Sequence, residues 1–268
     1  MCLLVVVFGL DPGAPLVVGA NRDERLDRAA TAVTVLRESA PRVLGGRDEE
    51  AGGTWLAVNE HGVAAGITNR PSPEGRDPAK RSRGELPLAL AGHRNASHAV
   101  EDFASRFGPR DFNPAWLLVG DRHALYALDM TGGAEVGDEV GVEELAPGIH
   151  ILENAPLGAP SVKVDLVRTL LGDAADRRGE DLVAGVRSVL ADHRVPEVAT
   201  HHGERGVEDA SGRPVETLAP CVHGAAYGTR SSTVIVVASD PGRLPRIEVA
   251  DGHPCTAPFA DAAPLWAR

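Results

Sequence analysis

Short apolar runs stand at both ends of the chain, and apolar residues at helical spacing lie between them. Residues 3–9 and 16–19 are almost wholly apolar, and the turn sequence Asp11-Pro12-Gly13 separates them, so they predict two strands joined by a turn. The same pattern predicts further strands at 55–58, 62–67, 116–119, 124–128, 149–152, 227–238 and 244–249.

Helices are predicted where apolar residues recur every three or four positions, at 97–107, 162–171 and 180–193. The other segments are polar. Residues 21–25 are expected at the end of the second strand, followed by a polar loop as far as Gly46. Residues 69–84 are rich in Pro, Arg and Gly and are expected to form an exposed loop, while 194–220 give few structural cues.

The order of these elements predicts the fold class. Strands dominate both ends and the helices cluster between them, which indicates an α+β sandwich with helices outside stacked sheets. At 268 residues and 43% hydrophobic content, the chain can bury a substantial core. We find neither an internal repeat nor a linker, and we therefore expect one domain over residues 1–268.

Charge and hydropathy argue against several classes of function. A formal net charge of -11 argues against nucleic-acid binding and against docking on an anionic membrane. The first apolar run ends at Asp11, which is too short for a membrane span, and no basic residue precedes it as in a secretion signal. We therefore expect a cytoplasmic protein with no membrane span.

The cysteines and histidines do not form a recognised metal motif. There are three cysteines, Cys2, Cys221 and Cys255, and no C-x-x-C, so neither a disulfide framework nor a zinc ribbon is supported. The adjacent pair His201-His202 has poor ligand spacing, and no H-E-x-x-H, P-loop or G-x-S-x-G is present. The sequence therefore predicts no metal and no cofactor.

Cys2 is the most informative residue, because it directly follows the initiator Met1. Aminopeptidase removes a Met that precedes a residue as small as Cys, which would leave a thiol and a free α-amino group on one residue. The amine, with a pKa near ~8, can take the proton of a thiol with a pKa near ~8.5, and the pair can then act as a nucleophile with its own base. The alternative is a small, semi-buried residue without a catalytic role.

Arg22 and Asp23 would lie close to Cys2 if the first two strands form a hairpin, because the chain then returns to its start around residue 20. A carboxylate there can hold the α-ammonium group, and a guanidinium favours the thiolate. The alternative is a surface salt bridge at a strand end.

Other candidates are polar residues at strand ends. Asparagines at such positions can donate to a developing oxyanion or can simply occupy turns, and they are Asn21, Asn59, Asn69 and Asn154. Arg230 precedes an apolar strand; it can bind a substrate carboxylate or the catalytic centre, or face solvent from an edge strand.

Several ordered motifs together resemble a known family. They are Met1-Cys2, Asn21-Arg22-Asp23-Glu24, Gly45-Gly46-Arg47-Asp48, Gly53-Thr54-Trp55-Leu56 with Asn59 and Gly62, Thr68-Asn69, Ser82-Arg83-Gly84-Glu85, Asn154-Ala155-Pro156-Leu157 and Tyr227-Gly228-Thr229-Arg230-Ser231. This set, which extends to about residue 238, resembles the NRDE protein family, also called the transport-and-Golgi-organisation-protein-two family. That family is similar, more remotely, to N-terminal nucleophile hydrolases of the choloylglycine hydrolase and penicillin V acylase type. The resemblance implies a four-layer αββα sandwich.

The resemblance also implies roles for individual residues. Cys2 would be the nucleophile and Asp23 would orient its free amine. Asn69 and Asn154 would supply oxyanion or amine contacts, and Arg230 would be the distal active-site arginine.

Asn21, Trp55 and Asn59 belong to the same motifs and are our candidates for substrate binding. In one respect this chain departs from the acylases, which have an arginine three residues before the aspartate, where this chain has Ala20. Arg22 is a candidate replacement, since positions 20 and 22 face the same side of a strand about 6–7 Å apart.

Two functions remain open at this point. The first is a cysteine-dependent hydrolase that cleaves a non-peptide amide or related acyl bond of a small-molecule substrate through a Cys2 acyl-enzyme. The second is a non-catalytic binder or carrier of haem, acyl-CoA or lipid, as the resemblance to eukaryotic family members implies. In either case the loops 69–84 and 194–220 are expected to shape the pocket mouth, because loops carry specificity.

Overall fold

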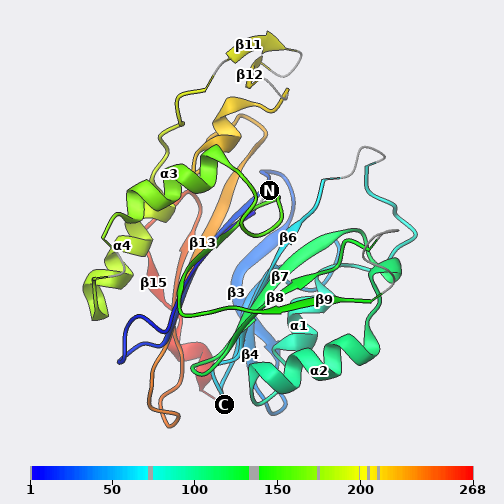
Figure 1. The fold of residues 1–268 in the computed structure, drawn as a ribbon, viewed down its shortest axis with the longest axis vertical. Helices are drawn as coiled ribbons and strands as arrows, with labels where there is room; N and C mark the ends of the chain where they lie inside the picture. The colour runs from blue at the N-terminus through cyan, green and yellow to red at the C-terminus, as the bar shows by residue number, and fades with distance from the viewer. Residues whose placement is uncertain are drawn as a thin grey trace.

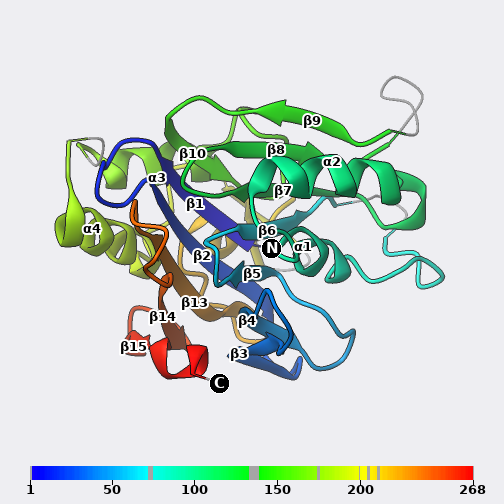
Figure 2. The same ribbon diagram turned by 90° about the horizontal axis from the view of Figure 1, so that it is seen from below.

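Two antiparallel sheets pack face to face and carry helices on their outer faces, which makes a four-layer αββα sandwich (Figure 1, Figure 2). The protein is represented by a computed structural model that describes residues 2–71, 75–132, 139–173, 176–198, 200–203, 206–209 and 212–267. The architecture confirms the fold class that the sequence predicts.

The first sheet contains the start of the chain. Its strands run in the order β10 (Gly148–Leu152), β1 (Cys2–Phe8), β2 (Leu16–Arg25), β13 (Tyr227–Val237), β14 (Arg246–Asp251) and β15 (Ala260–Asp261). β1 and β2 form the expected hairpin, in a register that places Cys2 opposite Arg22. The first strand is therefore an inner strand, and Cys2 lies at its end.

The second sheet is a meander in chain order. It consists of β3 (Ala30–Arg37), β4 (Val43–Asp48), β5 (Leu56–Asn59), β6 (Ala64–Asn69), β7 (Ala115–Gly120), β8 (Leu125–Asp129) and β9 (Gly141–Glu144). A separate hairpin pairs β11 (Thr200–Gly203) with β12 (Gly206–Asp209).

Each sheet has its own pair of helices. α1 (Glu85–Leu90) and α2 (Ala96–Arg106) cover the second sheet, and α3 (Val162–Leu171) and α4 (Gly179–Ala191) cover the first. Single turns of 3-10 helix occur at Pro109–Asp111, Val215–Leu218 and Ala263–Trp266. Among the helices that the structure describes, α4 is the longest at 13 residues, and none is long and apolar enough to cross a membrane.

β1 is apolar along its whole length because both of its faces are buried. Leu4 and Val6 belong to the core between the sheets, whereas Leu3, Val5 and Val7 pack under α3 and α4. Successive strand residues point to opposite faces, so a strand between two layers needs apolar residues at every position.

The sequence was misread where polar residues lie inside strands. β2 continues through residues 21–25, which were expected at its end, because these residues are paired with β13 and mostly buried. The expected loop before Gly46 contains β3 and the start of β4. The alternating Thr and Val residues of β3 fit a half-buried strand. The short elements α1, β9, β11 and β12 were also missed.

We expect Gly19→Ala to lower the free energy of unfolding by about 1–3 kcal/mol, because it overpacks the contact between β2 and α4. A Cβ atom at position 19 would lie 2.4 Å from Cγ1 of Val186. Urea denaturation measures the effect. Gly108→Ala is the matched control, because nothing lies within 4 Å of its added Cβ atom. Equal midpoints for the two variants would contradict close packing of α4 on β2.

Candidate active site

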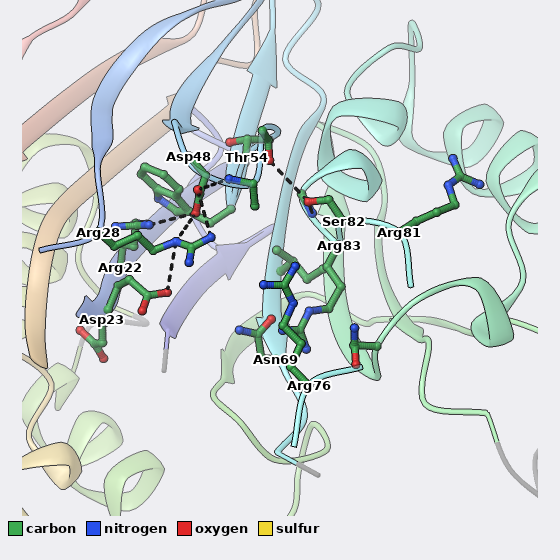
Figure 3. Close-up of a pocket in the computed structure, with 17 residues that line it drawn as sticks. Arg22, Asp23, Arg28, Asp48, Thr54, Asn69, Arg76, Arg81, Ser82 and Arg83 are labelled. Carbon is green, nitrogen blue, oxygen red and sulfur yellow. Dashed lines mark hydrogen bonds and ion pairs between the residues drawn. The ribbon is translucent and has the colours of Figure 1, made fainter. Parts of the chain in front are cut away.

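A pocket of about 300 Å³ opens beside residues 21–25, the polar half of β2 (Figure 3). Its walls are the end of β2, the turn between β4 and β5, the end of β6 and the loop from 76 to 84. Four of the predicted site residues line it, namely Arg22, Asp23, Trp55 and Asn69. The expectation that the loop 69–84 helps to shape the pocket is therefore confirmed for its described part.

Arg22 is held between an aromatic ring and a carboxylate. Its guanidinium carbon lies 4.4 Å from the centroid of the Trp55 ring, and its Nη2 donates to Oδ2 of Asp48 at 3.2 Å. The ring can lie this close to β4 because residue 46 is glycine, where an added Cβ atom would come within 2.0 Å of the indole. The Nη1 atom of Arg22 is buried without a hydrogen-bond partner among the described residues. Arg22 therefore keeps one buried donor for a group in the pocket.

Asp48 fixes two arginines at this wall (Figure 3). Besides Arg22, it accepts hydrogen bonds from Arg28 Nε at 2.7 Å and Nη2 at 3.1 Å, and from the backbone N–H of Ala51 at 2.9 Å. Burial alone would raise the pKa of Asp48, but these hydrogen bonds and the charges of Arg28 and Arg22 outweigh it, so the pKa lies below its ordinary value of 3.8.

Asp23 faces the opposite side of the sheet from Arg22, as neighbours on a strand do. Its carboxylate is fully buried, 3.5 Å from Nζ of Lys163 on α3, and accepts a hydrogen bond of 2.6 Å from the hydroxyl of Thr229. The hydroxyl of Tyr227 donates to its backbone carbonyl at 2.7 Å. Burial raises the pKa of Asp23, and the charge of Lys163 opposes this only in part.

Asn154 and Asn69 are in direct contact. The Asn154 side-chain amide donates to the backbone carbonyl of Asn69. β10 pairs with β1 as far as Leu152 opposite Leu4, and Asn154 follows two residues after this pairing ends. On its other side β1 pairs with β2, where Arg22 is opposite Cys2. The side chain of Cys2, and all of Met1, are outside the described residues.

Asn21 and Asn59 do not line this pocket. Asn21 donates to the carbonyls of Leu190 and Pro220 at 2.9 and 2.8 Å, and so ties β2 to the end of α4. Asn59 donates to the carbonyl of Ala91 at 2.8 Å and accepts from the backbone N–H groups that follow it. Both amides are fully buried, so they stabilise backbone instead of facing a substrate.

Arg230 also lies outside the pocket lining. It occupies the irregularity in β13 between Thr229 and Ser231, and its guanidinium donates to the backbone carbonyl of Leu26. The structure therefore brings Arg22, Asp23 and Asn69 to one pocket, with Asn154 hydrogen-bonded to Asn69, but it does not bring Arg230 there.

Sequence reasoning did not identify three residues that hold the site together: Lys163, Asp48 and Arg28. Lys163 carried a usable signal, because it lies four residues before Val167 and so falls on the apolar face of a predicted amphipathic helix. A lysine on such a face needs a buried counter-ion.

Asp48→Asn should lower the free energy of unfolding by about 1–3 kcal/mol at neutral pH, because two arginines lose their charged acceptor. The folded-state pKa of Asp48 is lowered, so its contribution is complete above the ordinary value of 3.8 and disappears as the pH falls through the folded-state pKa. Urea midpoints measured from pH 7 downward should therefore converge for the two proteins. Asp27→Asn, at a side chain that is 77% exposed, should leave the midpoint unchanged. A difference between the urea midpoints of the wild type and Asp48→Asn that persists at the lowest pH would refute the ion pairing of Asp48 with the two arginines.

Lys163→Met should lower the free energy of unfolding by about 3–5 kcal/mol, because it leaves Asp23 buried without its cation. Adding Asp23→Asn should restore much of this loss, since the second change removes the uncompensated charge. Arg168→Met removes one side of the exposed pair with Asp165 and should cost no more than ~1 kcal/mol. Chemical denaturation of the wild type, Lys163→Met, Asp23→Asn and the double variant gives the coupling energy, and a double variant no more stable than Lys163→Met would disprove it.

The chain is similar to known proteins over nearly its whole length. Residues 1–249 match the family model described as Transport and Golgi organisation 2. A Transport and Golgi organization protein 2 homolog of Bos taurus is 33% identical over 264 residues, 90% of each chain. A Transport and Golgi organization 2 homolog of Mus musculus is 28% identical over 257 residues, 88% of each chain.

A solved structure supports the fold. The Caenorhabditis elegans N-acylethanolamine-hydrolyzing acid amidase ortholog superposes with a TM-score of 0.52 at 14% identity, over 90% of this chain and 94% of that one. The chain therefore shares the fold of that solved structure. Because the family model matches residues 1–249 and a relative is 33% identical over 90% of each chain, the chain belongs to the Transport and Golgi organisation 2 family.

Proposed function

We propose that the protein is an N-terminal-cysteine hydrolase that cleaves a non-peptide amide or related acyl bond of a small molecule. Removal of Met1 would give Cys2 a free α-amino group. The observation that carries the proposal is the strand register: Cys2 is paired with Arg22, and the adjoining pocket is lined by Arg22 and Asn69. The sandwich of an acid amidase supports the same reaction class.

In this reaction the Cys2 sulfur attacks the acyl carbon while the α-amine takes the thiol proton. The oxyanion accepts hydrogen bonds from the side-chain amide of Asn69 and from Nη1 of Arg22, which has no hydrogen-bond partner in the described part of the chain. The α-ammonium then protonates the leaving amine, and a water molecule hydrolyses the thioester and regenerates the thiol. Asp23 is too deeply paired with Lys163 to take a proton from Cys2, so its role is to orient the chain end electrostatically.

Labelling should show an activated thiol at Cys2. A brief pulse of haloacetamide at neutral pH, followed by intact mass and peptide mapping, should find Met1 absent and the label on Cys2. Burial and the neighbouring Cys255 raise the pKa of Cys221 to about 12, so Cys221 should stay unlabelled. Retention of Met1, or equal labelling of Cys221, would eliminate the hydrolase.

Cys2→Ala should then reduce kcat/KM for an amide substrate on the order of 10³–10⁶-fold, with an unchanged unfolding midpoint. Ser105→Ala, at an exposed side chain outside the pocket lining, serves as the control and should retain activity. A Cys2→Ala enzyme with full turnover would rule out the acyl-enzyme.

A second candidate is a non-catalytic binder or carrier of acyl-CoA, haem or lipid. The arginines of the pocket favour an anionic ligand, because Arg22, Arg28, Arg76, Arg81 and Arg83 all line it. Calorimetric titration with acyl-CoA and with haem separates the carrier from the hydrolase. A carrier binds one of these ligands equally well in the wild type and in the Cys2→Ala protein, and releases the ligand unchanged. Absence of heat and of any thermal shift with either ligand would remove this candidate.

A further inference from the structure

Five side chains that can ligate a metal meet at the end of the first sheet, away from the pocket. Cys221, His223 and His253 have ligand atoms that all lie within 4.8 Å of one another, and so do His193, His223 and Cys255. Nε2 of His223 is 3.5 Å from Sγ of Cys221 and 3.1 Å from Sγ of Cys255, and the two sulfurs are 4.0 Å apart. His223 is the centre of the cluster.

The cluster is built from two short motifs of mirrored order. Cys221-Val222-His223 precedes β13, and His253-Pro254-Cys255 follows β14. Antiparallel pairing places Ser231 opposite Asp251, so the start of β13 and the end of β14 lie together. Residues 224–252 separate the two motifs in sequence, whereas the sheet brings the motifs into contact.

Backbone hydrogen bonds hold the cluster independently of any ligand. The Cys221 N–H donates to the carbonyl of Asp192 at 2.8 Å, which brings the residue after Asp192 to the same place. The Gly252 N–H donates to the backbone carbonyl of Arg230 at 2.9 Å, and the Ala257 N–H donates to the backbone carbonyl of His253 at 2.7 Å. The backbone segments that carry the cysteine and histidine side chains are therefore held in place by hydrogen bonds.

The cluster combines sulfur and imidazole ligands. Nδ1 of His253 is buried without a hydrogen-bond partner among the described residues. Two thiols and three imidazoles that face one another are a donor set that transition metals prefer.

We propose that this cluster binds one Zn²⁺ ion through Cys221, His223, Cys255 and one further histidine, His253 or His193. A tetrahedral site with Zn–S near ~2.3 Å and Zn–N near ~2.05 Å has sulfur–sulfur and sulfur–nitrogen separations of roughly 3.8 and 3.6 Å. The observed separations of 4.0, 3.5 and 3.1 Å need only small adjustments. Binding replaces the two thiol protons, which pass to solvent, and the resulting site is neutral.

Four protein ligands indicate a structural ion, and the structure shows what it would stabilise. Val222 lies between two of the ligands, and its N–H donates to the hydroxyl of Thr229 at 2.8 Å. That hydroxyl donates in turn to Asp23 at 2.6 Å. An ion bound to the residues on both sides of Val222 would therefore fix the hydroxyl that orients Asp23.

Metal analysis of the untagged protein, purified without chelators or a polyhistidine tag, tests the proposal. Inductively coupled plasma mass spectrometry should find about one zinc ion per chain. Cys221→Ser and His223→Ala should lose it. Cys2→Ala and the exposed-histidine variant His123→Ala should retain it, and the pair His193→Ala and His253→Ala should identify the fourth ligand, because only one of them loses zinc.

A second measurement avoids reliance on variants that fold poorly. Mercurial titration of the wild-type thiols should release zinc in step with thiol modification, and Co²⁺ loaded into the stripped protein should show thiolate-to-metal charge transfer. Zinc retained by His223→Ala would overturn the site. Metal-free protein with Cys221 and Cys255 joined in a disulfide would overturn it too, and would assign the cluster to thiol oxidation instead.

Discussion

The rest of the structure depends on the burial of two opposite charges at neighbouring positions of one strand. Arg22 and Asp23 are 3% and 2% exposed, and they point to opposite faces of the first sheet. A charge that leaves water destabilises the fold by several kcal/mol unless it is paired and hydrogen-bonded. Each face of β2 therefore has to provide a partner of the opposite sign.

The two layers beside β2 meet this requirement differently. The second sheet provides Asp48 and the Trp55 ring for Arg22, and this wall is polar, open and adjacent to the pocket. The helical layer provides Lys163 for Asp23, and this ion pair is fully buried. Replacement of such a buried ion pair by apolar residues of similar volume is often neutral or stabilising, so the pair itself is weak evidence for stability, whereas loss of one partner is costly.

The sequence was sufficient for the parts of the fold that depend on local patterns. The β1–β2 hairpin, α2, α3 and α4 follow from apolar spacing and one turn signal, and the structure confirms them. The strand through residues 21–25 could not be recognised, because its polar side chains are buried only by partners that are distant in sequence. Arg22 and Asn69 could be named as site residues because they stand in recognisable motifs. The contact between Asp48 and Arg22 could not be foreseen, and Lys163 was overlooked although its place on an apolar helix face was a signal.

Asn21 shows that an asparagine at a predicted strand end can be mistaken for a substrate-binding residue. Its motif suggested a substrate contact, but its amide holds Leu190 and Pro220 in place, and Pro220 directly precedes Cys221. The asparagine thereby links β2 to the segment that carries the cysteine–histidine cluster.

Hydrogen bonds also connect the cysteine–histidine cluster to the buried carboxylate of Asp23. Asp23 is oriented by Thr229, Thr229 by Val222, and Val222 by the two ligand positions on either side of it. If that segment moved, the carboxylate would lose its hydrogen bond and its pKa, already raised by burial, would rise further. The mirrored C-x-H and H-x-C motifs could not be read as one site from the sequence, because only the β13–β14 register makes them neighbours. A buried charge on β2 and a metal-binding cluster at the sheet's end are thus consequences of one arrangement of three strands.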